Sequence, residues 1–236
     1  MLKVLKFGGT SVGTLDRIAN VAQIIKKIRD EGHDVIAIVS AMSGETNKLI
    51  EYAEYYTKTP DLKEMDMLLS SGERVTSALL SIALNSIGYK AISMTGREAG
   101  IMTTDTHTKA KIEKIDTQKM KNALSEGNII IVAGSIKADV CEIYTDVDGI
   151  YTTDPRIEPK AKKLEKISYD EMLELASLGA KVLQNRSVEM AKKLNVNLVS
   201  RSSFTPDVEG TLITNEEEIM EKPIVSGIAL DKNQVR

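Results

Sequence analysis

The feature that most constrains the fold is an alternation between short apolar runs and longer amphipathic stretches. Residues 2–7 and 35–39 have the length and content of buried strands. Between them, apolar residues recur at helical spacing over residues 15–28 and stop before Gly32. A strand, a crossing helix and a second strand form the unit of a parallel sheet covered by helices. The pattern therefore predicts an α/β layered domain.

The same alternation continues along the chain. We predict further strands at 90–94, 128–132, 140–145 and 196–201, and helices over 46–84 (broken by Pro60), from Asp116 to Gly127, from Ser168 to Leu178 and over 187–194. Ser168 and Glu171 have the spacing of a capping box, and Gly179 ends that helix. Residues 103–115 are polar and show no clear period.

One connection between two predicted strands is too short for a parallel crossover. Only seven residues, 133–139, separate the strands at 128–132 and 140–145. Parallel neighbours need a crossover of about a dozen residues or more. Either these two strands are not parallel neighbours, or a segment is missing between them.

Composition excludes several classes of function. The chain has 31 Lys and Arg against 34 Asp and Glu, a net charge of −3, which is not the basic footprint of a nucleic-acid-binding protein. The single cysteine, Cys141, cannot form an internal disulfide or a cysteine-based zinc site, which favours a reducing compartment. Apolar runs fall short of the roughly 20 residues that span a bilayer. We expect a cytoplasmic protein that binds neither nucleic acid nor membrane.

The first chemical motif is a glycine turn between a strand and a helix. Lys6, Gly8 and Gly9 precede Thr10 and Ser11, and the helix follows. Backbone N–H groups at such a turn can face an anion, and glycines let the backbone approach it closely. Lys6 could neutralise a phosphoryl group during transfer. The alternative is a tight turn with a solvated lysine.

The second motif lies at the end of the strand at 35–39. Ser40, Ser43 and Thr46 place small hydroxyl groups where ligands bind in open α/β sheets, outside the carboxyl ends of the strands. The alternative for Ser43 and Thr46 is helix capping.

The third motif is a glycine inside a predicted helix. Gly72 costs roughly 1 kcal/mol relative to alanine there, which suggests a close approach or a helix break. Glu73, the next residue, could bind an ammonium group. The alternative is a surface glutamate paired with Arg74 or a lysine.

The fourth motif follows the strand at 140–145. Its residues could hold a nucleotide with its magnesium ion, or could form an ordinary turn-rich loop. It contains three acids, two tyrosines and an arginine: Asp146, Asp148, Asp154, Tyr144, Tyr151 and Arg156.

Together and in this order, the motifs resemble those of the aspartate kinases. They read KFGGTSV at 6–12, VSAMSGETN at 39–47, LLSSGE at 68–73, TDVDGIYTTDPR at 145–156, SLGAKVL at 177–183 and RSSF at 201–204. The resemblance implies the amino acid kinase (carbamate kinase-like) fold, an αβα sandwich around a mainly parallel sheet. It implies transfer of the γ-phosphoryl group of MgATP to the side-chain carboxylate of L-aspartate, the first step toward lysine, threonine, methionine and diaminopimelate.

The resemblance also implies roles for single residues. Lys6 matches the lysine at the transferring phosphates, with Gly8 and Gly9 beside it, and Ser40, Thr46 and Glu73 match the aspartate-binding positions. The nucleotide-binding positions are Thr145, Asp146, Tyr151, Arg156, Lys181 and Val182. ATP and Mg²⁺ are the implied cofactors, no residue is assigned as a metal ligand, and the family allows a homodimer.

Two departures from the family stand out. Relatives carry a hairpin, a Gly-Arg-Gly-Gly-Ser-Asp loop and a helix after the equivalent of Gly134, and none of this is in the sequence. We favour a mobile segment absent from the numbered chain over a genuine deletion, which would cripple catalysis. A Cα separation between residues 134 and 135 well beyond 3.8 Å would reveal such a break. We also expect residues 1–224 to form the catalytic domain, and residues 225–236 to lead into regulatory ACT domains that are not present.

Two alternative functions stay open. One is another amino acid kinase, such as a glutamate or acetylglutamate kinase, against which Glu73 in its SGE context argues. The other is a nucleotide-binding module without catalysis, which the missing loop supports.

Overall fold

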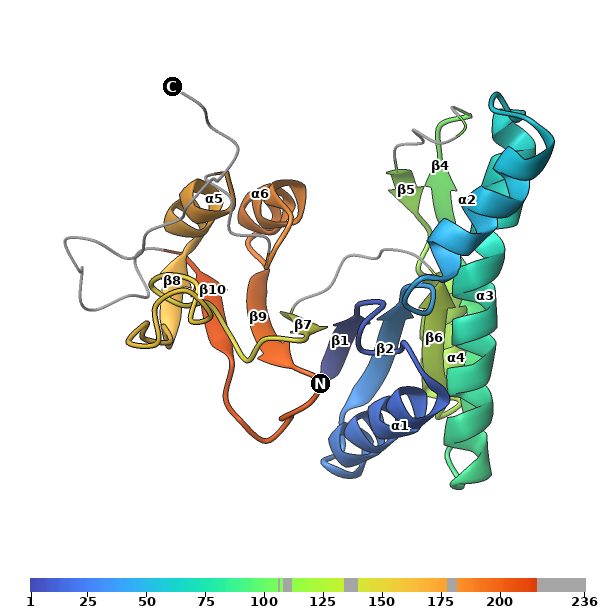
Figure 1. The fold of residues 1–236 in the computed structure, drawn as a ribbon. Helices are drawn as coiled ribbons and strands as arrows, with labels where there is room; N and C mark the ends of the chain where they lie inside the picture. Colours follow the sequence, from blue (N-terminus) through green and yellow to red (C-terminus); the bar gives the residue numbers. More distant parts are fainter. Residues whose placement is uncertain (106, 108–111, 134–139, 178–181, 216–236) are drawn as a thin grey trace. The chain divides into compact units, whose positions relative to one another are not determined.

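The computed structural model describes residues 1–105, 107, 112–133, 140–177 and 182–215. The chain divides into two compact units, residues 1–138 and 139–236, and Figure 1 traces their elements. In each unit, helices pack against a sheet.

The first unit contains a parallel four-stranded sheet with the order β3-β6-β2-β1. Its elements are β1 (Leu2–Phe7), α1 (Leu15–Asp30), β2 (Asp34–Val39), α2 (Glu45–Tyr56), α3 (Leu62–Ser86), β3 (Ala91–Thr95), β4 (Ile101–Thr103), β5 (Ile112–Ile115), α4 (Gln118–Ser125) and β6 (Ile129–Ala133). Phe7 pairs with Val39, and both Val39 and Thr95 pair with Ala133. The strands therefore end in register, along one edge.

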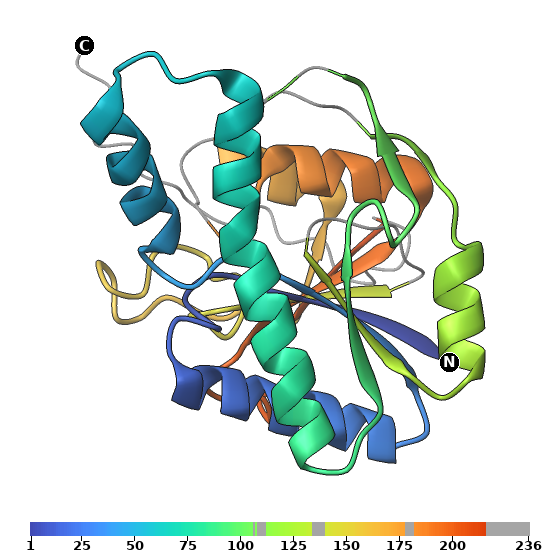
Figure 2. The same cartoon turned by 90° about the vertical axis from the view of Figure 1, so that its right-hand side faces the viewer.

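The central strands β2 and β6 are buried on both faces, which explains why they read as continuous apolar runs. One face packs against Met120 and Ala123 of α4 through Val4, Ile36, Ile38, Ile130 and Val132. The alternate residues, at most 2% exposed, belong to the other face: Leu5, Phe7, Val35, Ala37, Val39, Ile129 and Ile131. Helices α1 and α3 contact the strands and each other, and Figure 2 shows α3 passing in front of the sheet.

The second unit is a mixed sheet with the order β7-β9-β10-β8. Its elements are β7 (Val140–Thr145), β8 (Lys166–Ser168), α5 (Tyr169–Ser177), α6 (Asn185–Leu194), β9 (Asn197–Ser202) and β10 (Thr211–Thr214). The pairs β7·β9 and β10·β8 are parallel, and β9·β10 is antiparallel. Its core joins the sheet to α5 and α6, with Cys141 packed against it as a small apolar side chain.

The predicted α/β class and mainly parallel sheet are confirmed, and so are the strands and helices predicted from periodicity. Four strands of the described residues escape prediction: β4 and β5, which pair antiparallel at and around the polar stretch, and the short strands β8 and β10. Each strand has only three or four residues, too few to display a period. The predicted cap Asp116 needs a small correction. Its carboxylate accepts from Gln118 N at 3.1 Å, but the N-cap residue of α4 is Thr117.

The short connection of seven residues lies between β6 and β7. Both sides of β6 are occupied, by β2 and by β3. The strands at 128–132 and 140–145 are therefore not parallel neighbours, which is the first of the two alternatives. The junction between residues 134 and 135 lies outside the described residues, as do residues 225–236 and the predicted helix end at Leu178 and Gly179.

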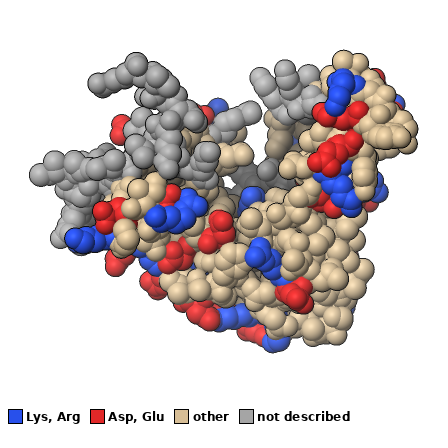
Figure 3. Space-filling view, in the orientation of Figure 1, with Lys and Arg blue, Asp and Glu red and all other residues tan. Residues whose placement is uncertain are grey.

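Charge is distributed as its near balance predicts. On the face in Figure 3, Lys and Arg side chains are interspersed with Asp and Glu. Among the described helices, none has both the length and the apolar character needed to cross a membrane.

Candidate active site

The first unit builds its site around the glycine turn that follows β1. The carbonyl of Gly8 accepts from Ser11 N at 2.9 Å and closes the turn. A Cβ atom at Gly9 would lie 3.0 Å from the carbonyl oxygen of Ala41. Glycine at this position therefore lets the turn touch the next strand-to-helix loop. Lys6, half-buried in β1, lies two residues before the turn.

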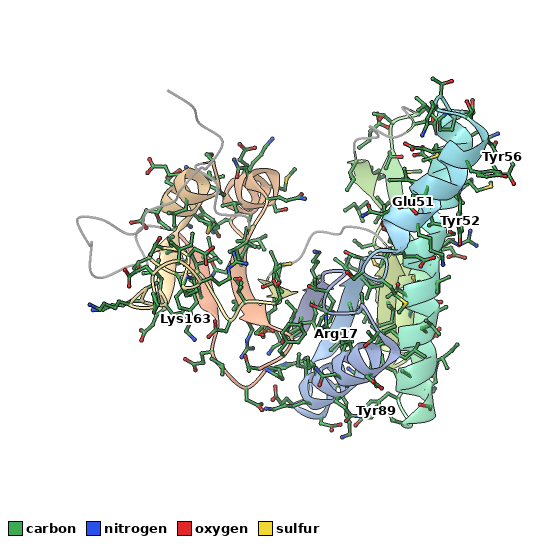
Figure 4. All side chains as sticks on the ribbon, viewed as in Figure 1. Arg17, Glu51, Tyr52, Tyr56, Tyr89 and Lys163 are labelled. Atoms are coloured by element: carbon green, nitrogen blue, oxygen red, sulfur yellow. The ribbon has the colours of Figure 1, made fainter. Side chains whose placement is uncertain are left out.

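A side chain that the sequence did not single out supports this turn. Arg17, in the first turn of α1, donates from Nη1 to the carbonyl of Thr10 at 2.5 Å (Figure 4). Thr14 caps the same helix by accepting from Arg17 N at 3.3 Å. The turn is thus tied to the helix that follows it.

The loop after β2 begins the second part of the site. Ser40 N donates to the carbonyl of Phe7 at 3.2 Å, so this loop starts level with the end of β1. The N-cap residue of α2 is Gly44, with a φ of 83° that favours glycine. The capping alternative for Ser43 and Thr46 is therefore wrong. Thr46 is exposed in the first turn of α2, and Ser40 is half-buried.

Helix α3 supplies the third part. It runs unbroken through Gly72, so close approach and not a helix break explains this glycine. A Cβ atom there would lie 2.9 Å from the Cβ of Ala41. Glu73 follows, half-buried. Within the described residues no ion pair joins Glu73 to Arg74 or to a lysine, so the surface-pair alternative finds no support.

Three glycines, two at the first motif and one in the third, meet the same short segment. Gly9 and Gly72 approach Ala41, and a Cβ at Gly13 would lie 3.2 Å from the Cβ of Ser43. The first three motifs, far apart in sequence, therefore form one region at the carboxyl edge of the parallel sheet, where α/β proteins bind ligands.

The second unit holds the fourth motif, which starts at the end of β7. Thr145 Oγ1 accepts from Val147 N at 3.2 Å and donates to its carbonyl at 3.0 Å, which forms a tight turn around the exposed Asp146. Tyr151 donates to Asp148 Oδ1 at 2.9 Å, and Lys163 Nζ lies 3.7 Å from Asp148 Oδ2. Burial, and then the hydrogen bond to Asp148, raise the pKa of Tyr151, so its phenol stays a neutral donor at pH 7.

Arg156 is held at the end of this motif by a bidentate contact. Its Nε and Nη2 donate to the two carboxylate oxygens of Asp154 at 2.9 and 2.7 Å. These hydrogen bonds, with smaller contributions from the charges of Asp154 and Asp146, raise the pKa of Arg156. The guanidinium stays 84% exposed and can reach an anionic ligand.

The remaining predicted positions, Val182, Lys181 and Tyr144, are not all found at a nucleotide surface. Val182 is partly buried against the core of the second unit, where a packing role suffices to explain it. Lys181 lies outside the described residues. Tyr144 is buried and donates to Glu142 Oε2 at 2.9 Å. Burial is the main cause that raises its pKa, so Tyr144 belongs to the core and not to a nucleotide surface.

No metal centre is formed by the protein alone in the part of the chain that the structure describes. No group of three or more His, Cys, Asp or Glu there could hold a metal ion. Of the three acids in the fourth motif, Asp148 and Asp154 already accept from Tyr151 and Arg156. Asp146 is the exposed one.

Comparison with known proteins places this chain in a family. The sequence profile of the amino acid kinase family matches residues 1–136 and residues 130–199. The chain belongs to the amino acid kinase family.

The names of individual relatives are more specific than the family's. An aspartokinase of Helicobacter pylori is 51% identical over all of the chain, which spans 66% of that relative's length. The crystal structure of an aspartate kinase from Synechocystis superposes with a TM-score of 0.82 at 42% identity, and the match covers 95% of this chain and 41% of that one. E. coli aspartokinase III, solved with aspartate and ADP, shares the fold at 24% identity and a TM-score of 0.78, covering 91% of this chain and 65% of that one.

The family match of the chain is divided into two parts that overlap at residues 130–136. The alignment with the Helicobacter protein runs over 267 positions, whereas the chain has 236 residues. At least 31 positions of the relative therefore face no residue of this chain.

Proposed function

We propose that this chain carries the catalytic region of an aspartate kinase, which transfers the γ-phosphoryl group of ATP to the side-chain carboxylate of L-aspartate. The observation that carries the proposal is the meeting of Gly9, Gly13 and Gly72 on the segment after β2. It brings the glycine turn, the hydroxyl-bearing loop and Glu73 into one region. The 51% identity to an aspartokinase supports the choice of aspartate as substrate.

In this proposal the first unit binds the reacting groups. Lys6, with Gly8 and Gly9, faces the phosphates, because a lysine charge and close backbone approach both favour a phosphoryl group in transfer. Glu73 binds the ammonium group of aspartate, and Ser40 and Thr46 offer hydroxyl groups beside it.

The second unit binds the nucleotide. Thr145, Asp146, Tyr151 and Arg156 lie along one segment, with a neutral phenol and an exposed guanidinium as donors. Lys181 and Val182 complete the proposed set. Mg²⁺, held mainly by the phosphates of the nucleotide with Asp146 as the accessible carboxylate, would neutralise phosphate charge.

The reaction needs no covalent nucleophile from the protein. The acceptor carboxylate has an ordinary pKa near 3.9 and is ionised at pH 7, so no base has to remove a proton. One carboxylate oxygen forms the new bond to the γ-phosphorus, the bond from that phosphorus to the β,γ-bridging oxygen breaks, and ADP leaves. The residues of the site therefore act by position and charge.

A second candidate is a nucleotide-binding protein that does not turn over. It is favoured by the divided family match and by the 267-position alignment, which support a segment missing near residues 134 and 135. In the family that the sequence resembles, this segment supplies an arginine and a serine to aspartate and an aspartate near the phosphates. We therefore expect the present chain to bind nucleotide and to turn over slowly or not at all.

Aspartate-dependent ADP formation separates the two candidates. It should be measured on this chain and on a chain in which the corresponding segment of a relative is restored after Gly134. Isothermal titration with MgADP should be run in parallel on both. Turnover that appears on restoration, and falls about 100-fold or more with Lys6→Met, supports the aspartate kinase. MgADP binding without turnover in either chain supports the non-catalytic protein, and no binding in either contradicts both.

A further inference from the structure

Two hydroxyl groups on the sheet of the second unit hold the proposed nucleotide segment, residues 145–156. The first belongs to Ser203, immediately after β9. Its backbone N–H donates to the carbonyl of Thr145 at 3.0 Å, and its Oγ donates to the same carbonyl at 3.1 Å. Thr145 and Ser202 form the last register pair of β7·β9. Ser203, only 1% exposed, therefore fixes the peptide from which the nucleotide segment departs.

The second hydroxyl belongs to Thr211, the first residue of β10. Its Oγ1 accepts from Ile150 N at 2.8 Å and donates to the carbonyl of Leu164 at 2.5 Å. Leu164 N in turn donates to the carbonyl of Ile150 at 2.8 Å. Thr211 is completely buried. One hydroxyl thus ties together the outgoing and returning limbs of the chain around residues 150–164.

The backbone is shaped to accept this contact. A Cβ atom at Gly149 would lie 2.6 Å from Thr211 Oγ1 and 3.1 Å from the Cδ of Lys163. Only glycine leaves room for the hydroxyl to reach the N–H of Ile150. Lys163 also donates to the carbonyl of Glu209 at 2.7 Å, which links the same turn to the chain just before β10 (Figure 4).

We infer that Thr211 and Ser203 are positioning residues of the nucleotide site, which hold Tyr151 and the main chain after Thr145 in the geometry that nucleotide binding requires. The inference rests on the proposed function, since it assigns these two residues to the site that would bind ATP. Neither side chain has to touch the nucleotide. A segment fixed beforehand loses less conformational entropy on binding, so the two hydroxyls act through affinity.

The test measures affinity for MgADP by isothermal titration, with the thermal midpoint of unfolding measured on the same variants. Thr211→Val keeps the branched shape and removes both hydrogen bonds. Thr211→Ser keeps the hydroxyl. Thr214→Val is the matched control: it is on the same strand and equally buried, and its hydroxyl donates to Asn197 Oδ1 at 2.7 Å at the other end of the strand.

We expect Thr211→Val to weaken MgADP binding roughly 5- to 10-fold, the factor that corresponds to about one net hydrogen bond. Thr211→Ser should remain within about twofold of the unsubstituted chain, and so should Thr214→Val, although it lowers the unfolding midpoint. Ser203→Ala, which keeps the backbone bond, should weaken binding about 2- to 5-fold. This milder variant supplies a readout if Thr211→Val does not fold.

The possible failures can be told apart. If the unsubstituted chain binds MgADP and Thr211→Val changes the affinity no more than Thr214→Val does, the two hydroxyls are structural only and the inference is wrong. If Ser203→Ala leaves the affinity for MgADP unchanged, Ser203 is not a positioning residue of the nucleotide site. If the unsubstituted chain does not bind MgADP at all, the proposed function fails first and the inference fails with it.

Discussion

The contact between Gly72 and Ala41 can be tested by adding a methyl group at residue 72 and removing the one at residue 41. Adding a methyl at residue 72 places it 2.9 Å from the Cβ of Ala41, closer than such atoms approach in proteins. The next neighbour, Leu49 Cδ1, lies 3.7 Å away, an ordinary contact. Ala41 is therefore the single obstacle to Gly72→Ala, and Ala41→Gly removes it.

Two effects of opposite sign set the magnitude. Alanine in place of glycine inside a helix stabilises it by about 1 kcal/mol. An extra methyl in a filled space costs typically 1–3 kcal/mol. We expect Gly72→Ala to lower the free energy of unfolding by up to about 2 kcal/mol in the natural background. In the Ala41→Gly background the same change should raise it by about 1 kcal/mol.

Urea unfolding of the four chains of this double-mutant cycle measures the coupling between residues 72 and 41 directly. The expected coupling is about 1–3 kcal/mol, the cost of the overpacked methyl. If Gly72→Ala stabilises both backgrounds equally, α3 does not approach the loop after β2 as described. The three motifs would then lose the strongest of the contacts that bring them into one region.

Three further changes probe other parts of the fold. Arg201→Met leaves the buried carboxylate of Glu142 without its ion-pair partner, 3.4 Å away, and should lower the free energy of unfolding by roughly 3 kcal/mol in urea. Ser168→Ala removes the capping box of α5 and should cost about 1 kcal/mol in the same assay. Hydrogen bonds from the backbone N–H and the hydroxyl of Thr95 lower the pKa of Glu98 below its ordinary 4.5. The ionised form therefore stabilises the fold above pH 4.5, and this contribution is lost as the pH falls through the lowered pKa. Glu98→Gln should be less stable than the unsubstituted chain at pH 7, and the gap should close in acid.

Each of these changes has its own control. Combining Arg201→Met with Glu142→Gln removes both charges and should recover part of the lost stability. No recovery would mean that lost packing, not the stranded charge, explains the single variant. Ser125→Ala removes an exposed hydroxyl at the end of α4 and should change stability by less than about 0.5 kcal/mol. A gap for Glu98→Gln that does not vary with pH would contradict the role of its ionised carboxylate.

Prediction from sequence succeeded where local pattern and tertiary packing agree. Residues 35–39 are buried on both faces, so they form an uninterrupted apolar run and are identified as a strand. β10 has only four residues and β8 only three, and their strand character comes from pairing with each other and with β9. No local signal marks such strands in advance.

The candidate site divides in the same way. Lys6, Glu73 and Arg156 stand in motifs that the sequence displays. Arg17 and Thr211 belong to no sequence motif. Their roles come from hydrogen bonds to the backbone, Arg17 to the carbonyl of Thr10 and Thr211 to the N–H of Ile150, which exist only in the folded chain. A side chain that acts on the backbone of another segment can be recognised only after the two segments are placed together.

The sequence by itself determined the class of fold, the charge balance and the four motifs, because periodicity, composition and glycine spacing are local properties of the chain. Tertiary structure decided that Gly72 marks a close approach and not a break, and that Ser43 and Thr46 do not cap α2. It also decided that β6 and β7 are not parallel neighbours. Each of these depends on which distant backbone occupies the space beside a residue, and that is fixed only when the sheet and its helices pack.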